Sequence, residues 1–352
     1  MSAVYVSSQY LSNVLNLPVM QTKSALATAE VEASTGQYAD LGLQLGDQAG
    51  YELSLRTQTA LLQSLTDSNS IATTGLNTSQ SALSGILKDS QNTLQSLATW
   101  TSGNNSSSIL QNLGANALQS LTANANVSSN GGYVFGGINS GVAPMANYFS
   151  SPTSSAKAAI DAAFQTTFGM PPSDPAAASI SVSALQAFLT GPFAAQFQGS
   201  AWTSNWSSAS STNASQTIAP GQTVATSANL NQPGFQQLAQ GYAMLSELGG
   251  ANLSQAAQQL VASSAATLVA AGGSAVTAAA ATLGGAQQRI TEANGSMASQ
   301  LTILQTQIGN LDNVDANKTA VTINALMTQL QTAYQLTARL QQMSLAQYLP
   351  NA

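Results

Sequence analysis

The feature that most constrains this chain is a proline-free run of heptad-spaced residues over positions 51–101. Positions seven residues apart form two rows, Leu62, Asn69, Leu76, Leu83, Ser90 and Leu97, and Leu65, Ala72, Ser79, Ile86, Thr93 and Trp100. This spacing places both rows along one side of an α-helix, in the pattern that packs against other helices. At 1.5 Å per residue, about 50 residues form a rod of roughly 75 Å, so we expect the longest uninterrupted helix here. Two shorter helices broken near Gly75 are the alternative.

Both ends of the chain carry narrow apolar stripes. Residues 7–34 predict a helix with Leu11, Val14 and Leu15 on one face, kinked or interrupted at Pro18 and ended by a left-handed Gly36. Residues 297–349 have a second stripe, with a polar break at 312–318; its members are Leu301, Leu304, Ile308, Leu311, Ile323, Leu326, Leu330, Leu340 and Leu345. A stripe this narrow indicates a seam for other helices rather than the broad buried face of a globular helix.

The segments between these helices differ in texture. Residues 37–50, with a glycine at every fourth position from Gly42, predict an ordered but non-helical connector. The glycine spacing superficially resembles a phosphate loop, but no Lys-Ser or Lys-Thr follows it, so a structural role is favoured. A turn at 103–107 should lead into an antiparallel return helix that ends near Ser128 and carries Ile109, Leu113, Leu118 and Leu121. An aromatic strand between glycine turns is expected at 130–137.

Residues 140–233 are rich in proline and predict an outward-facing domain inserted into the helical frame. Within it we expect a helix at 176–189, a short strand at 202–208, and a pair of short strands at 216–218 and 223–226 that turns at Pro220-Gly221. Helices resume at 235–248, 253–271 and 274–311. The predicted fold is mainly α: an elongated antiparallel helical bundle or coiled coil formed by the N- and C-terminal regions, with a small α+β or β-rich middle domain. The expected divisions are 1–50, 51–139, 140–233, 234–311 and 312–352.

Composition excludes most chemistry. Cysteine and histidine are absent and only 6% of residues are charged, so we expect no catalytic residues, no cofactor and no metal. The net charge of -6 offers no basic footprint for nucleic acid. The apolar stretch 260–283 is rich in alanine and is broken by Ser and Gly, which predicts a helix that does not insert in a membrane. An enzymatic middle domain would have only Lys157, Asp161 and Asp174 to work with.

Three segments resemble the flagellin superfamily. The run Glu32-Ala33-Ser34-Thr35-Gly36-Gln37-Tyr38-Ala39-Asp40 is similar to the segment where the first helix of these proteins gives way to a spoke. The run Asn130-Gly131-Gly132-Tyr133-Val134-Phe135-Gly136-Gly137 resembles a segment of the hook-associated branch, and residues 334–349 resemble its terminal helix. Residues 36–55 and the Tyr348-Leu349 ending are most like hook–filament junction proteins of alphaproteobacterial type. The likeness covers about 1–140 and 235–352.

The resemblance implies a structural subunit of the bacterial flagellum, extracellular at the hook–filament junction and exported by the flagellar type III route without a cleaved signal peptide. It implies that residues 1–34 and 318–352 are poorly ordered alone and pair as a coiled coil on assembly. The expected partners are hook-associated junction protein, flagellin, further copies of the chain and an export chaperone. The residues expected to form the assembly seam are Leu11, Val14, Leu15, Leu326, Leu330, Leu340 and Leu345.

Two other functions remain open from the sequence. One is filament flagellin itself, although filament flagellins carry more charge in the segment that matches residues 51–101. The other is an adhesin whose helices form a stalk and whose middle domain binds a ligand. In that case Trp202 and Trp206, four residues apart, could form a stacking platform for a sugar ring.

Overall fold

A computed structural model describes the backbone of residues 8–101 and 107–348, and their side chains except at 8–15, 340, 341 and 343–348. The described chain is mainly α-helical, with two small two-stranded sheets, which confirms the predicted fold class. It divides into two compact units, residues 1–62 with 299–352 and residues 63–298. Most of the turn predicted at 103–107 lies outside the described residues.

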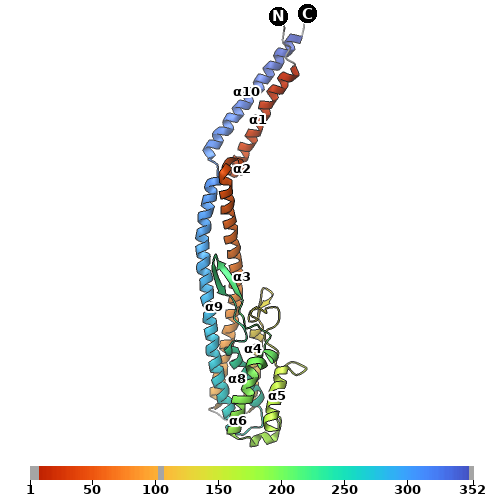
Figure 1. Ribbon diagram of the computed structural model, residues 1–352, viewed down its shortest axis with the longest axis vertical. Helices are drawn as coiled ribbons and strands as arrows, with labels where there is room; N and C mark the ends of the chain where they lie inside the picture. Colours follow the sequence, from red (N-terminus) through yellow and green to blue (C-terminus); the bar gives the residue numbers. More distant parts are fainter. Residues whose placement is uncertain (1–7, 102–106, 349–352) are drawn as a thin grey trace. The chain divides into compact units, whose positions relative to one another are not determined.

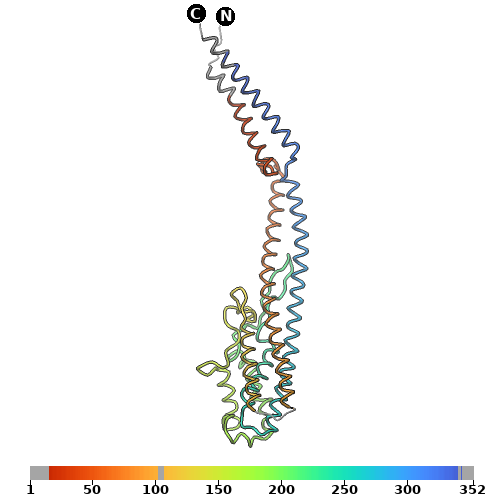
Figure 2. The backbone as a smooth tube through the Cα atoms, turned by 180° about the vertical axis from the view of Figure 1, so that it is seen from behind, coloured from red at the N-terminus to blue at the C-terminus, as the bar shows by residue number. Residues whose placement is uncertain are grey.

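Two long helices, α3 (Ala49–Thr101) and α9 (Gln255–Asp312), lie side by side in Figures 1 and 2. The heptad analysis of α3 is confirmed, because all six members of the first predicted row are buried, including the polar Asn69 and Ser90. Within residues 63–298 the buried polar groups bind α9. Asn69 Nδ2 donates to Asn294 Oδ1 (2.7 Å) and Ser90 Oγ donates to the carbonyl oxygen of Val269 (3.3 Å).

Helix α9 corrects two predictions about length and breaks. It has 58 residues against 53 in α3, so the segment at 51–101 is not the longest helix. The predicted break near 272–273 is also absent, because these glycines serve close packing rather than termination. A Cβ on Gly272 would lie 2.7 Å from Leu238 Cγ, and one on Gly273 would lie 2.9 Å from Ser90 Oγ. The backbones can therefore approach where any larger side chain would separate them.

A window of α9 is long and apolar enough to cross a membrane on length and composition alone. That test is weak, because core helices of water-soluble proteins also pass it. In this structure one face of α9 is used for packing inside residues 63–298, where Val261, Val269, Val276 and Leu283 are all buried.

Helix α4 (Ser107–Ala125) packs against α8 (Pro233–Leu248). Leu118 and Leu121 are buried as predicted, but Ile109 is exposed and Leu110 is buried in its place. The buried stripe of α4 runs through Leu110, Gly114, Ala117 and Leu121, so the inward face is turned by one residue at the start of the helix. The helix also ends at Ala125, before the predicted limit near Ser128.

The segment predicted as an aromatic strand is mostly loop. Strand β2 contains only Gly132–Tyr133 and pairs antiparallel with β1 (Ser128–Ser129). Asn130 and Gly131, both at positive φ (52° and 80°), make the two-residue turn between them. Beyond β2 the chain leaves the ladder so that the side chain of Phe135 can enter the core, 5.3 Å from the ring of Phe235.

Residues 140–233 contain short helices and one hairpin. The helices are α5 (Ser155–Phe168), η2 (Pro175–Ser179), α6 (Val182–Phe188), η3 (Leu189–Phe193), η4 (Ala194–Phe197) and α7 (Gly199–Asn205). Strands β3 (Ser215–Ala219) and β4 (Gln222–Ala225) confirm the predicted hairpin. The predicted helix at 176–189 is interrupted because Ser181 leaves the helical backbone and caps α6 by accepting from the Ala184 N–H. The strand predicted at 202–208 is wrong, since Trp202 lies in α7.

The unit formed by residues 1–62 and 299–352 contains α1 (Ser8–Thr35), α2 (Leu41–Leu45), η1 (Gly46–Gln48) and α10 (Ala316–Tyr348). Helix α1 continues through Pro18 and ends at Gly36, whose φ of 72° is the predicted left-handed stop. The connector at 37–50 was predicted to be non-helical, which is wrong: the Asp40 carboxylate accepts from the Leu43 N–H (2.9 Å) and starts α2.

Candidate assembly surfaces

Helices α1 and α10 pair along a seam with heptad spacing, and Figures 1 and 2 show them side by side. On α1 the less exposed positions are Val19, Thr22, Leu26 and Ala29; on α10 they are Thr319, Ile323, Leu326, Leu330, Ala333 and Thr337. Steps of three and four residues keep each set on one face, as in a coiled coil. The Lys23 ammonium lies 5.5 Å from the ring centre of Tyr334, which adds a cation–π contact across the pair.

Two of the seven predicted assembly residues, Leu326 and Leu330, are half-buried on this seam. The side chains of Leu11, Val14, Leu15, Leu340 and Leu345 lie outside the described residues, although their backbones belong to α1 and α10. Their contribution to assembly therefore stays a prediction.

Both helices also display apolar side chains away from the seam, a feature that the sequence analysis missed. On α1, Leu17, Met20 and Val31 are exposed, Met20 to 67%; on α10, Val321 and Leu336 are exposed, Val321 to 69%. Residues 17, 20 and 31 share one side of a helix, opposite Leu26. Their helical spacing is the signal in the sequence that marks this second apolar row. Large apolar side chains in rows on a helix favour contact with another surface.

A junction of main-chain hydrogen bonds ties the end of α1 to the end of α9. The Tyr38 N–H donates to the carbonyl oxygen of Asp312 (2.9 Å), and the Val314 N–H donates to that of Gly36 (3.0 Å). Between them Gln37 and Asn313 form an antiparallel bridge. The polar break predicted at 312–318 is confirmed in position but is shorter, because α9 ends at Asp312 and α10 begins at Ala316 after an Asp315 cap.

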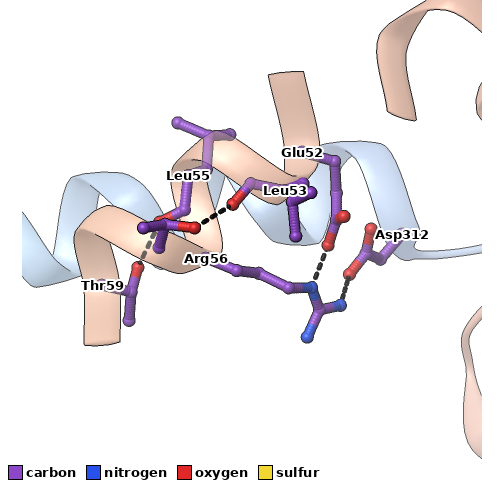
Figure 3. A network of polar contacts seen from close by, with 7 residues as sticks. Glu52, Leu53, Leu55, Arg56, Thr59 and Asp312 are labelled. Carbon is purple, nitrogen blue, oxygen red and sulfur yellow. Dashed lines mark hydrogen bonds and ion pairs between the residues drawn. The ribbon is translucent and has the colours of Figure 1, made fainter. Parts of the chain in front are cut away.

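An ion triad adjoins the junction, shown in Figure 3. Arg56 of α3 donates through Nε to Glu52 and through Nη2 to Asp312 Oδ2 (2.5 Å). The Asp312 side chain is only 1% exposed, whereas that of Arg56 is 49% exposed. The hydrogen bond to Glu52, helped by the charges of both carboxylates, raises the pKa of the guanidinium against the lowering effect of burial. The other Asp312 oxygen, Oδ1, is buried without a hydrogen-bond partner.

The residues weighed for an enzymatic middle domain have structural partners. The Lys157 ammonium binds Asp161 (3.3 Å) and Glu247 (2.6 Å) beside an open cavity of about 550 Å³. Burial lowers the pKa of Lys157, but the hydrogen bond to Glu247 and that carboxylate's charge outweigh it and the net shift is upward. Asp174 caps η2 by accepting from the Ala176 N–H. Among the residues whose positions are described, no cluster of three acidic, His or Cys side chains could hold a metal ion.

The sugar platform suggested for Trp202 and Trp206 is wrong. Both rings are buried, stacked 5.8 Å apart, and Trp206 also stacks on Tyr148 at 5.2 Å. The pair belongs to a continuous aromatic core that includes Phe197 and Phe193. No indole face is left for a ligand, so the adhesin hypothesis loses the feature on which it rested.

The described surfaces comprise the seam between α1 and α10 and the exposed apolar side chains on the outer sides of these two helices. Residues 6–140 match the bacterial flagellin N-terminal helical region, and residues 267–349 match the bacterial flagellin C-terminal helical region. No curated protein matches the chain. Since the two matched regions together cover more than half of its residues, the chain belongs to the flagellin family. It is a structural subunit of the bacterial flagellum. As a member of this family it associates with copies of itself and with other flagellar subunits, and it is an extracellular component exported by the type III route.

Proposed function

We propose that this subunit is the hook–filament junction protein, of the type found in alphaproteobacteria, rather than the filament flagellin. The observation that carries the proposal is the segment of residues 130–137, which resembles the hook-associated branch. Its glycines have specific structural tasks: a Cβ on Gly136 would lie 2.7 Å from the carbonyl oxygen of Asn139, and one on Gly137 2.5 Å from that of Thr212. The likeness therefore rests on residues that the fold requires.

In the proposed mechanism α1 and α10 form the assembly element. Leu11, Val14 and Leu15 pack against Leu326, Leu330, Leu340 and Leu345 in the seam of one subunit. Neighbouring subunits cover the outer apolar rows, Leu17 with Met20 on α1 and Val321 with Leu336 on α10. A lone helix pair is marginal in water, and it gains stability when neighbours remove these apolar side chains from solvent. Low charge in both helices limits the number of ions that such packing must bury.

The position in the flagellum is tested by labelling this subunit in the flagella of the bacterium that encodes it. A label confined to a band between hook and filament supports the junction role. Label along the whole filament would show a filament flagellin, the second candidate, which the family match by itself equally favours. A strain that lacks the gene gives the matching test, because loss of a junction protein leaves hooks without attached filaments.

The assembly seam is tested with a pair of charge substitutions on α10. Leu330→Asp places a carboxylate in the seam, whereas Gln331→Asp places the same charge at an exposed position outside both the seam and the outer apolar row. We expect incorporation into flagella to fall at least about tenfold for Leu330→Asp and to stay near wild type for Gln331→Asp, as a buried unpaired charge costs several kcal/mol. Equal incorporation of both variants would refute the seam. Deletion of residues 318–352 should abolish incorporation and leave residues 63–298 folded.

Two predictions about partners and organisation follow from the same proposal. An export chaperone is expected to bind the chain before assembly and to cover its apolar rows. Residues 140–233 are expected to face outward, with 1–50, 51–139, 234–311 and 312–352 as the other functional divisions. Binding of the chain to hook-associated protein and to flagellin, measured separately, tests the expected neighbours.

A further inference from the structure

Both chain connections between the α1–α10 pair and the helices α3 and α9 pass through the junction described above. One is the segment from Gly36 to α2, and the other is the break between Asp312 and Ala316. They are joined to each other by the hydrogen bonds of Tyr38 and Val314. The Ala39 N–H adds a bond to the Glu32 carboxylate (3.2 Å). Movement of the pair α1–α10 away from α3 and α9 would therefore have to break these few hydrogen bonds at the two chain connections.

Arg56 supplies the positive charge that binds the two carboxylates beside the junction. Its guanidinium binds two carboxylates at once, Glu52 on its own helix and Asp312 at the last position of α9. Asp312 is the less replaceable partner, because its side chain is 1% exposed and its second oxygen has no hydrogen-bond partner. Without Arg56, the buried Asp312 carboxylate would face the nearly buried Glu52 carboxylate with no opposite charge between them. The Arg56 side chain is 49% exposed, so solvent screens part of the attraction, but its removal still leaves the buried Asp312 carboxylate without an opposite charge.

The backbone ties this charge arrangement to the hydrogen-bonded bridge. Asp312 binds Arg56 through its carboxylate and also accepts, through its backbone carbonyl oxygen, the hydrogen bond from the Tyr38 N–H. Displacement of Asp312 therefore moves the acceptor of the bridge. The neighbouring bond, from the Val314 N–H to the carbonyl oxygen of Gly36, lies only two residues further along the chain.

We propose that Arg56 and Asp312 form an electrostatic latch that holds the junction closed in the single subunit. When the latch opens, the two hydrogen bonds of the bridge break together and α1 and α10 are no longer held at the ends of α3 and α9, while residues 63–298 stay folded. This inference concerns the free chain, so it stands or falls independently of the proposed position in the flagellum.

Hydrogen exchange of backbone amides in the full-length free chain tests the latch. In Arg56→Gln we expect the amides of Tyr38 and Val314 to exchange about ten- to a hundredfold faster, the range set by loss of a charge-assisted hydrogen bond. Amides of residues 63–298 should keep their wild-type rates. Lys88→Gln is the matched control, since Lys88 is an exposed cation of the same helix outside the junction.

A double variant separates the latch from general damage. Asp312→Asn removes the buried charge, so Arg56→Gln combined with Asp312→Asn should recover protection at Tyr38 and Val314 relative to Arg56→Gln alone. The latch is refuted if Arg56→Gln leaves both amides at wild-type rates, or if it speeds exchange equally throughout residues 63–298. A double variant that exchanges as fast as Arg56→Gln would also refute it, because the buried charge would then not be the cause.

Discussion

The contact between α4 and α8 allows a sharp test of close packing, by the substitution Gly114→Ala. The added Cβ would lie 2.4 Å from the backbone nitrogen of Ser246, 2.6 Å from Leu245 Cβ and 2.6 Å from the carbonyl oxygen of Tyr242. An ordinary contact needs about 3.5 Å, so the helices must separate by roughly 1 Å. None of these atoms is the far end of a flexible side chain that could move aside.

The expected magnitude combines two opposing terms. Overpacking of this kind costs up to about 3 kcal/mol, and the better helix propensity of alanine returns about 1 kcal/mol. A net loss of about 2 kcal/mol corresponds to a fall in melting temperature of roughly 4–8 °C for a unit of this size. The control is Gly75→Ala in α3, where nothing lies within 4 Å of the added Cβ. There only the propensity term acts, and stability should rise by about 1 kcal/mol.

Tryptophan fluorescence during thermal unfolding measures both variants. The chain has three tryptophans, Trp100, Trp202 and Trp206, and all are buried within residues 63–298, the unit that also contains Gly114 and Gly75. The same substitution in two helices of that unit should thus shift the transition in opposite directions. If Gly114→Ala melts at or above the wild-type temperature, the reasoning on close approach of α4 and α8 is refuted.

Two further predictions concern buried polar groups in residues 63–298. Asn69→Ala removes the donor to Asn294 and to the carbonyl oxygen of Ile218, and should lower the free energy of unfolding in urea by about 1–3 kcal/mol; an unchanged midpoint would contradict this. Burial raises the pKa of the phenols of Tyr148 and Tyr242. The negative charge of Glu247 adds to this effect at Tyr148, and that of Asp89 adds to it at Tyr242. Because the folded state then holds these protons more tightly than the unfolded chain, their stabilisation is complete below pH about 10 and is lost as pH rises above it. Fluorescence-monitored stability should fall above that pH, and Tyr148→Phe should make the fall less steep; an unaltered slope would show that burial of the phenol is not responsible.

The parts of the fold that could be predicted from sequence are those governed by periodicity. The heptad rows placed the buried face of α3 correctly, including polar positions such as Asn69 and Thr93, because a helix of this length has one repeating geometry. The stop at Gly36 and the hairpin turning at Gly221 were also predictable, since both depend on a glycine at positive φ.

The errors arose where tertiary packing decides what a residue does. Gly272 and Gly273 favour a helix break by local propensity, but in the structure they allow α9 to approach Leu238 and Ser90. Trp202 and Trp206 looked like strand or surface residues because a helix of seven residues carries too little periodic signal. The ion triad could not be predicted either, because it depends on tertiary structure. Nothing in the sequence spacing indicates that Arg56 contacts a carboxylate 256 positions away.

The pairing of α1 with α10 also sets the order in which the chain can fold. The earliest described helix finds its partner only in the latest one, with the whole of residues 63–298 between them. Local helices can form within each stretch of the chain as it is synthesised, whereas the pairing of α1 with α10 requires both helices and all the residues between them. This long-range pairing also costs loop-closure entropy, which is smaller once residues 63–298 have folded. Until this pairing forms, α1 has no helix of its own chain to cover Leu26 and Ala29. A subunit truncated before α10 would therefore leave the apolar face of α1 uncovered.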